Sequence, residues 1–232
     1  MENRKIIVDT AFNTFGFLEE RLTKEWIEKR IDIFMKFTLQ SLKNQSNQDF
    51  LSLIRYENST EDYIRETLAK YPELPVNIKF IQDSYFESYL KNYAGDSPEI
   101  FITRIDSDNL YHKFYIQELR DYSPNESTQI LISQDGYVYD CLKQRLAYWF
   151  HESTPFYTLI YKTENYLKGK RYKLTSHSKA IKLRHEILPA GRFIVLIHSD
   201  NTLGAFNSSM RRERITDPLL LRKTLQDFGV VL

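Results

Sequence analysis

The sequence predicts an α/β fold in which a mostly parallel central sheet is flanked by helices and followed by a mixed or antiparallel part. The first observation is that strand-like and helix-like segments alternate four times within the first 122 residues. The second is that short strand-like segments crowd the remainder of the chain. The third is the length of 232 residues, which suits one sizeable domain and is short for two. We therefore expect a single domain over residues 1–232.

The first half carries four strand-and-helix units. Thr23 is a plausible N-cap for the first helix, because apolar side chains recur at helical spacing after it. Strands are predicted for residues 6–8, 50–56, 76–81 and 99–105, and helices for residues 23–45, 61–70, 83–93 and 111–122.

The second half changes to closely spaced strands, which favours antiparallel or mixed pairing. Asp135-Gly136 is a strong signal for a tight turn. Strands are predicted for residues 128–133, 136–140, 145–150, 156–161 and 192–198. No internal repeat or linker interrupts the pattern.

The charge balance excludes a strong general attraction to nucleic acid or to an anionic membrane. The net charge is +1, from 32 basic and 31 acidic residues. The one local basic cluster, Arg211-Arg212-Glu213-Arg214, is typical of a solvated helix or loop face, and the alternative is a contact to phosphate or to an acidic surface. Cys141 is the single cysteine, so internal disulfides and CxxC metal sites are excluded.

The first ten residues show no apolar signal-peptide segment, and no apolar run approaches the roughly 20 residues of a membrane-spanning helix. We therefore expect a cytoplasmic protein without an integral membrane segment.

Polar loops follow each predicted strand of the first half, and ligands of open α/β sheets bind outside the carboxyl ends of the strands. Asp106-Ser107-Asp108, which follows the fourth strand, is the most informative of these loops. Residues two apart in an extended segment point the same way, so both carboxylates can converge on one point. Their repulsion is relieved by a cation, and oxygen ligands suit Mg²⁺ or Mn²⁺ bound to a substrate diphosphate. The alternative is a capping or turn aspartate.

Residues 102–114, ITRIDSDNLYHKF, resemble the "TRLDxDDxLHxxF" signature of the rhamnosyltransferase-like glycosyltransferases, which are similar to the wider GT-A class. Other segments resemble the family in the same order along nearly the whole chain: residues 11–17, the helix pattern from Trp26 through Arg30 and Phe34 to Gln45, residues 153–156, residues 176–178 and residues 195–201. Departures from the family pattern occur at Ala11, Asn109, Ser178, Ser199 and Asp200.

The resemblance implies a GT-A-type nucleotide-sugar fold and a metal-dependent glycosyltransferase. Residues 1–122 would form the nucleotide-sugar half and residues 123–232 the acceptor half. The implied cofactor is Mn²⁺ or Mg²⁺, and the implied partners are a nucleotide-diphosphate sugar, with rhamnose as a candidate sugar, and a saccharide or protein-glycan acceptor. No nucleic acid is implied.

The resemblance also implies roles for individual residues. Asp108 would be the main metal ligand, Asp106 would contact ribose or metal, and His198 would complete the metal or diphosphate site. Arg104 would steady the diphosphate, and the base and ribose pocket would be lined by Thr10, Asn13 and Asp83. The alternatives are a hydrogen-bonded core histidine for His198, a surface ion pair for Arg104 and a helix N-cap for Asp83.

An inverting transfer needs a general base that deprotonates the acceptor hydroxyl. Glu164 follows a predicted strand and precedes a predicted acceptor-side loop, so it is the first candidate. Glu152, beside His151, is the second.

Two other classes of function are left open. A metal-dependent phosphohydrolase of the DxD type would place its acidic pair after the first strand, where this chain has Asp9-Thr10-Ala11, and is therefore disfavoured. A non-catalytic sugar- or nucleotide-binding module would not need Asp106-Ser107-Asp108 and His198 together.

Overall fold

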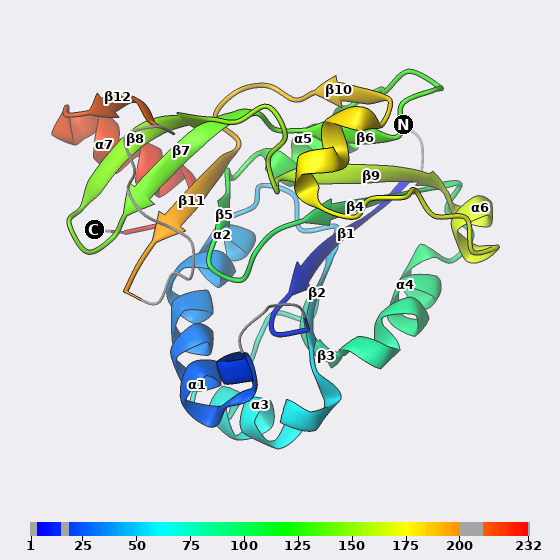
Figure 1. Ribbon diagram of the computed structural model, residues 1–232, viewed down its shortest axis with the longest axis horizontal. Helices are drawn as coiled ribbons and strands as arrows, with labels where there is room; N and C mark the ends of the chain where they lie inside the picture. The colour runs from blue at the N-terminus through cyan, green and yellow to red at the C-terminus, as the bar shows by residue number, and fades with distance from the viewer. Residues whose placement is uncertain (1–3, 15–18, 200–210, 232) are drawn as a thin grey trace.

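The computed structural model describes residues 4–14, 19–199 and 211–231, which form two β-sheets with helices around them (Figure 1). The larger sheet has seven strands in the order β10-β6-β9-β4-β1-β2-β3. Its strands are β1 (Arg4–Ala11), β2 (Leu51–Tyr56), β3 (Ile78–Gln82), β4 (Glu99–Arg104), β6 (Ile130–Ile132), β9 (Tyr157–Lys162) and β10 (His185–Ile187).

The centre of the larger sheet is parallel, as the alternation of strands and helices predicts. β1 pairs in parallel with β2 and with β4, and β2 pairs in parallel with β3. β9 returns antiparallel beside β4 and also pairs antiparallel with β6. The predicted fold class, a mostly parallel sheet followed by a mixed part, is therefore confirmed. The two halves of the chain, residues 1–122 and 123–232, are not separate in space, because strands after residue 122 complete the same sheet.

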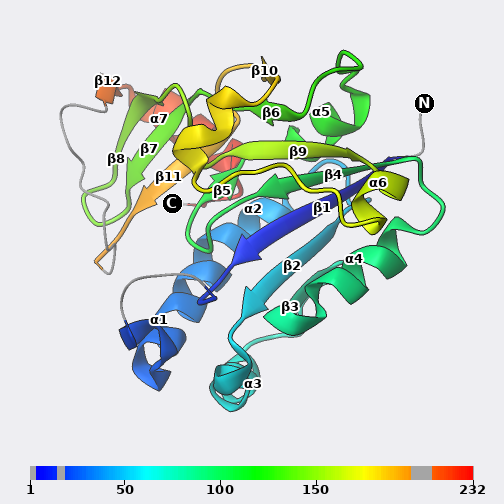
Figure 2. The same ribbon diagram turned by 45° about the vertical axis from the view of Figure 1, so that its right-hand side comes forward.

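Helices cover both faces of the larger sheet (Figure 2). Ile6 and Val8 of β1 point to the face covered by α1 (Lys24–Ile33), whereas Ile7 points to the face covered by α4 (Phe86–Ala94). Thr23 caps α1 as predicted, with its hydroxyl accepting from the backbone N–H of Trp26 at 3.4 Å. The first helix continues through a π-helical segment, Phe34–Thr38, into α2 (Leu39–Lys43). Helix α3 (Glu61–Leu68) contacts α1.

The second sheet has five strands in the order β12-β8-β7-β11-β5. These are β5 (Leu110–Tyr111), β7 (Asp135–Asp140), β8 (Arg145–Phe150), β11 (Phe193–Ile197) and β12 (Arg211–Ile215). Helix α7 (Pro218–Asp227) contacts β12 of this sheet, whereas α5 (Tyr115–Asp121) and α6 (Thr163–Leu167) contact β1 and β9 of the larger sheet. No helix within the described residues is long and apolar enough to cross a membrane.

Three sequence predictions in this region are wrong. Asp135-Gly136 lies inside β7 instead of forming a turn, because the hairpin between β7 and β8 turns at residues 141–144. Tyr111 belongs to β5, so the helix predicted from residue 111 begins at Tyr115. The basic cluster at residues 211–214 lies in β12, an edge strand, instead of a helix or loop face.

Gly136 is required by the contact between β7 and β11. A Cβ atom at this position would lie 2.6 Å from the Phe193 ring and 2.7 Å from the Phe193 carbonyl oxygen. Phe193 is fully buried and stacks on Phe156 with ring centroids 4.0 Å apart, so it has little room to yield. We expect Gly136→Ala to lower the free energy of unfolding by about 1–3 kcal/mol, measured by urea denaturation. An unchanged denaturation midpoint would contradict this close contact.

His112 makes stability depend on pH. Burial, helped by the charge of Arg192, lowers the pKa of His112 from 6.5 to about 4. Between these values the unfolded chain binds a proton that the folded protein does not, so stability falls as the pH drops from about 6.5 towards 4. We expect His112→Gln to flatten this part of the stability profile, followed by thermal unfolding across the range. Parallel profiles for the two proteins would contradict the assignment.

Candidate functional site

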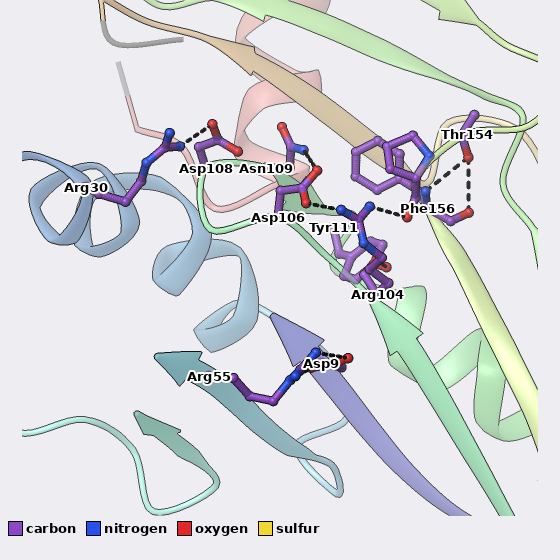
Figure 3. Close-up of polar contacts among 11 residues, drawn as sticks. Asp9, Arg30, Arg55, Arg104, Asp106, Asp108, Asn109, Tyr111, Thr154 and Phe156 are labelled. Carbon is purple, nitrogen blue, oxygen red and sulfur yellow. Dashed lines mark hydrogen bonds and ion pairs between the residues drawn. The ribbon is translucent and has the colours of Figure 1, made fainter. Parts of the chain in front are cut away.

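The candidate site lies where the carboxyl ends of the parallel strands meet. The backbone N–H of Ile105, after β4, donates to the carbonyl oxygen of Asp9 in β1 at 3.1 Å. The acidic loop of residues 106–108 follows directly, and β11 ends beside it with His198. Figure 3 shows the polar side chains of this edge: Arg30 and Asp108 on one side, Arg104 and Asp106 in the middle, and Asp9 and Arg55 on the sheet below them.

Asp108 is buried between α1 and the end of β11. Its Oδ2 atom accepts a hydrogen bond from Arg30 Nη1 at 2.5 Å and lies 3.1 Å from His198 Nε2. Arg30 is also buried, and its guanidinium lies over the Trp26 ring at 5.0 Å from the centroid. The π-helical turn that begins at Phe34 follows Arg30 closely. Helix α1 therefore delivers a fixed positive charge to the acidic loop.

The charge state of Asp108 follows from these neighbours. Burial works to raise the pKa of this carboxyl, but the hydrogen bond from His198 and the positive charge of Arg30 outweigh it, so the pKa of Asp108 is lowered. Asp108 is therefore a carboxylate near neutral pH. When it is ionised, His198 Nε2 carries the proton that faces it.

Asp106 is held in a different direction from Asp108. Its Oδ1 atom pairs with Arg104 Nη2 at 2.6 Å, and its Oδ2 atom accepts from the Asn109 side chain at 3.3 Å (Figure 3). Burial raises the pKa of Asp106, with the charge of Arg104 acting against the shift. Arg104 also donates to the carbonyl oxygen of Pro155 at 3.2 Å. Arg104 therefore forms the ion pair that was the alternative to a diphosphate contact, with Asp106 as its partner, and both side chains are half-buried.

Asn109 explains one departure from the family pattern. Its amide nitrogen donates to Asp106, while its amide oxygen accepts from the backbone N–H of Leu196 in β11 at 3.1 Å. An ionised aspartate at this position could accept but not donate. Asn109 therefore joins the acidic loop to β11, the strand that carries His198.

Asp108 and His198 are the two side chains of the predicted metal site that lie together, with Asp108 Oδ2 3.1 Å from His198 Nε2. The three-residue set of Asp106, Asp108 and His198 is not assembled, because Arg104 and Asn109 hold Asp106 away. Within the described ranges, no three His, Cys, Asp or Glu side chains form a group that could hold a metal ion. Oδ1 of Asp108 accepts no hydrogen bond from a described residue, so it is available beside the imidazole. One or two carboxylates commonly suffice for Mg²⁺ when substrate phosphates and water supply the other ligands.

A second charged cluster lies across the ends of β1, β2 and β3. Arg55 donates two hydrogen bonds to Asp9, from Nε to Oδ1 at 2.6 Å and from Nη2 to Oδ2 at 3.1 Å. Its Nη1 atom donates to Asp83 at the start of the 3₁₀ turn Asp83–Tyr85. The side chain of Asp83 caps no helix, so the N-cap alternative is wrong, and the carboxylate pairs with Arg55 instead.

Thr10 and Asn13, predicted to line the base and ribose pocket, are both fully buried. Asn13 uses both ends of its amide within the protein: Oδ1 accepts from the backbone N–H of Glu57 at 2.8 Å, and Nδ2 donates to Thr60 Oγ1 at 3.1 Å. Asn13 therefore fixes the loop after β2 beside the loop after β1. Thr10 Oγ1 has no hydrogen-bond partner among the described residues. Parts of the family-like segments, Phe15, Gly16, Phe17, Asp200 and Asn201, lie outside the described residues.

The first candidate for the general base does not agree with the geometry. Glu164 lies in α6, just after the end of β9, where Lys162 pairs with Glu99. Because β9 is antiparallel to β4, this end lies beside the start of β4, whereas Asp106 follows the opposite end. The length of β4 places Glu164 at least roughly 16 Å from Asp106. Its carboxylate pairs with Lys168 on the exposed surface.

The second candidate lies on the appropriate side of the sheet. Glu152 stands three residues before Pro155, whose carbonyl oxygen accepts from Arg104. Three residues span at most about 10 Å, so the loop carrying Glu152 borders the Asp106–Arg104 pair. Thr154 holds this loop by donating to the Ser133 carbonyl oxygen at 2.6 Å.

The sequence matches a known family over more than half of its length. Residues 18–156 match the model of the family described as "Putative rhamnosyl transferase", a range that includes α1 and the acidic loop. The chain belongs to this rhamnosyl transferase family. No curated protein matches the sequence significantly.

The solved structures to which the fold is similar include TarS of S. aureus and HddC of Yersinia pseudotuberculosis. For TarS residues 1–349 in complex with UDP-GlcNAc, the TM-score is 0.48 and the identity 14%, with 87% of this chain and 60% of that chain covered. For HddC the TM-score is 0.43 and the identity 14%, with 82% of this chain and 92% of that chain covered. The present chain therefore spans about 60% of the length of this TarS chain.

Sequence reasoning missed the arginines that organise the site. The sequence patterns include Arg30 only within the family-like helix segment, and they do not include Arg55. The available signal was the placement of Arg55 near the carboxyl end of β2, one strand away from Asp9 in β1. Recognising that Arg55 reaches Asp9 requires the register of β1 and β2, in which Arg55 lies opposite Ala11.

Proposed function

We propose that this protein is a glycosyltransferase that uses a nucleotide-diphosphate sugar as donor and a divalent cation, Mn²⁺ or Mg²⁺, as cofactor. The observation that carries the proposal is the buried Asp108 carboxylate with Arg30 on one side and His198 on the other. A lowered pKa keeps this carboxylate charged, which suits a cation ligand. The bound cation would neutralise negative charge on the diphosphate leaving group.

Each residue of the edge then has a distinct role. Asp108 and His198 hold the cation, and His198 Nε2 gives up its proton to do so. Arg30 is close enough to Asp108 to place its guanidinium against the diphosphate as well. Asp106 and Asp83 are the carboxylates offered to ribose and base hydrogen-bond donors, and they are oriented by Arg104 and Arg55.

The donor sugar and the acceptor are proposed from the family description. Rhamnose is the first sugar to test, because the matching family is described by rhamnosyl transfer. The acceptor is a saccharide or a glycan. Thermal shift measurements with a panel of nucleoside diphosphates, each with and without Mn²⁺, test the donor class. The right nucleotide at saturating concentration should raise the free energy of unfolding by a few kcal/mol and therefore raise the Tm. No shift with any nucleotide would overturn the proposal.

The two glutamates give a paired test of the general base. We propose Glu152 for this role and no role for Glu164. Glu152→Gln should lower the rate of sugar transfer by about a hundredfold or more, the usual contribution of a positioned base. Glu164→Gln should leave the rate unchanged, because Glu164 lies at the other end of β9. Equal rates for both variants and the unmodified enzyme would remove Glu152 from the mechanism.

A further inference from the structure

A hollow outside the donor edge is lined by two arginines. It has a volume of about 540 Å³ and lies between the β7–β8 turn, the end of β12 and the first turns of α7. Its lining residues are Gln144, Arg214, Ile215, Thr216, Pro218, Leu221 and Arg222. None of these carries a negative charge, so the hollow combines two positive charges with a small apolar wall.

Both arginines are available to a ligand. Arg214 in β12 and Arg222 in α7 are exposed, and neither forms an ion pair or hydrogen bond with any of the described residues. Glu213, which precedes Arg214, lies outside the lining, and two other acidic residues of the bordering segments are engaged elsewhere. Asp217 caps α7 by accepting from the backbone N–H groups of Leu219 and Leu220. Asp140, at the end of β7, is paired with Arg145.

The hollow lies along the same edge of the second sheet as His198. Across that edge, Ile197 of β11 pairs with Asp140 of β7, Asp140 pairs with Arg145 of β8, and Leu146 pairs with Ile215 of β12. Three strand spacings separate β11 from β12, which is roughly 14 Å. An extended saccharide can bridge this distance, with one end at the donor edge and the other in the hollow.

We propose that this hollow, the arginine pocket, binds a phosphate group carried by the acceptor saccharide. Guanidinium groups recognise phosphate through two parallel hydrogen bonds, and two arginines that line one hollow and have no partner among the described residues offer two such contacts. The term acceptor rests on the proposed transferase function. The binding of phosphate rests on the arginine pocket alone. The acceptor is therefore a phosphorylated saccharide instead of a neutral one.

The direct test measures binding of glucose 6-phosphate and of glucose by isothermal titration calorimetry. Glucose 6-phosphate should bind, and glucose should not. Arg214→Ala and Arg222→Ala should each weaken binding of glucose 6-phosphate by about tenfold, because each removes a charge-assisted contact. Lys223→Ala is the matched control: it removes an exposed positive charge next to Arg222 that does not line the pocket, and it should leave binding unchanged.

Two further arms make the outcome decisive. Vesicles of phosphatidylcholine with phosphatidylglycerol test a membrane surface, since exposed Leu142 and Leu219 lie in the segments that border the pocket. Binding to these vesicles without binding to glucose 6-phosphate would overturn the proposal, as would equal binding by the arginine variants and the unmodified protein. Asp108→Asn should abolish binding of a nucleoside diphosphate with Mn²⁺ and retain binding of glucose 6-phosphate. Failure of nucleotide binding alone therefore counts against the proposed function and not against the pocket.

Discussion

Asp108→Asn should reduce sugar transfer by about a thousandfold, which corresponds to roughly 4 kcal/mol of transition-state stabilisation. Asparagine has nearly the same shape but no charge, so the cation loses its anionic ligand. The diphosphate leaving group then loses the positive charge that neutralises it. The measurement is the initial rate of transfer, or of slow donor hydrolysis, over a range of Mn²⁺ concentrations.

The same substitution also affects stability, so it needs a matched control. Arg30 remains buried without an anionic partner in Asp108→Asn, and we expect the free energy of unfolding to fall by about 3 kcal/mol. Asp140→Asn provides the comparison, because Asp140 is likewise buried and paired with an arginine, Arg145. It should show a similar loss of stability with normal binding of nucleotide. Loss of nucleotide binding in both variants would mean that destabilisation, and not the lost ligand, is responsible.

Arg30→Met should destabilise the protein in a way that Mn²⁺ reverses. Removing the guanidinium leaves the Asp108 carboxylate buried with His198 as its remaining partner, at a cost of about 3–5 kcal/mol in the free energy of unfolding. A divalent cation supplies the missing positive charge. At a Mn²⁺ concentration about a hundred times its Kd, binding returns about 2.7 kcal/mol of stability. Thermal unfolding with and without Mn²⁺ measures the effect.

The control for metal rescue is Arg145→Met. It removes the arginine partner of another buried carboxylate, that of Asp140, at a place where no metal is proposed. Mn²⁺ should raise the Tm of Arg30→Met by more than that of the unmodified protein and should not rescue Arg145→Met. Equal shifts in the two variants would show that Mn²⁺ acts elsewhere.

The position of the acidic loop could be predicted from the sequence. A buried apolar strand, residues 99–105, ends directly in Asp106-Ser107-Asp108, and the alternation of strands and helices indicates a parallel sheet. These two observations place the loop at the ligand-binding edge without knowledge of any contact. The structure agrees, with Ile105 bonded to Asp9 across that edge.

The prediction that Asp106 and Asp108 converge on one point is wrong, because the two side chains are held by different partners. β4 ends at Arg104, so both aspartates lie beyond the strand, where the rule that alternate residues share a face does not apply. The direction of Asp108 is set by a long-range partner, Arg30, and that of Asp106 by its near neighbours Arg104 and Asn109. Only the assembled fold brings α1 to the acidic loop.

The misplacement of Glu164 has a similar cause. The sequence shows that Glu164 follows a strand, but it does not show in which direction that strand runs. β9 is antiparallel to β4, and its carboxyl end therefore lies at the edge opposite to the donor site. The rule for carboxyl ends of parallel strands places Asp106 correctly and misplaces a residue that follows an antiparallel strand.

The most direct test of the central claim is anomalous diffraction from crystals soaked with MnCl₂ and the nucleoside diphosphate that gives the largest thermal shift. The proposed function predicts one strong manganese peak within about 2–2.3 Å of the Asp108 carboxylate and His198 Nε2, with the diphosphate completing its ligands. A diphosphate bound at this edge without a manganese peak, and with Asp108 still paired to Arg30, would contradict the claim.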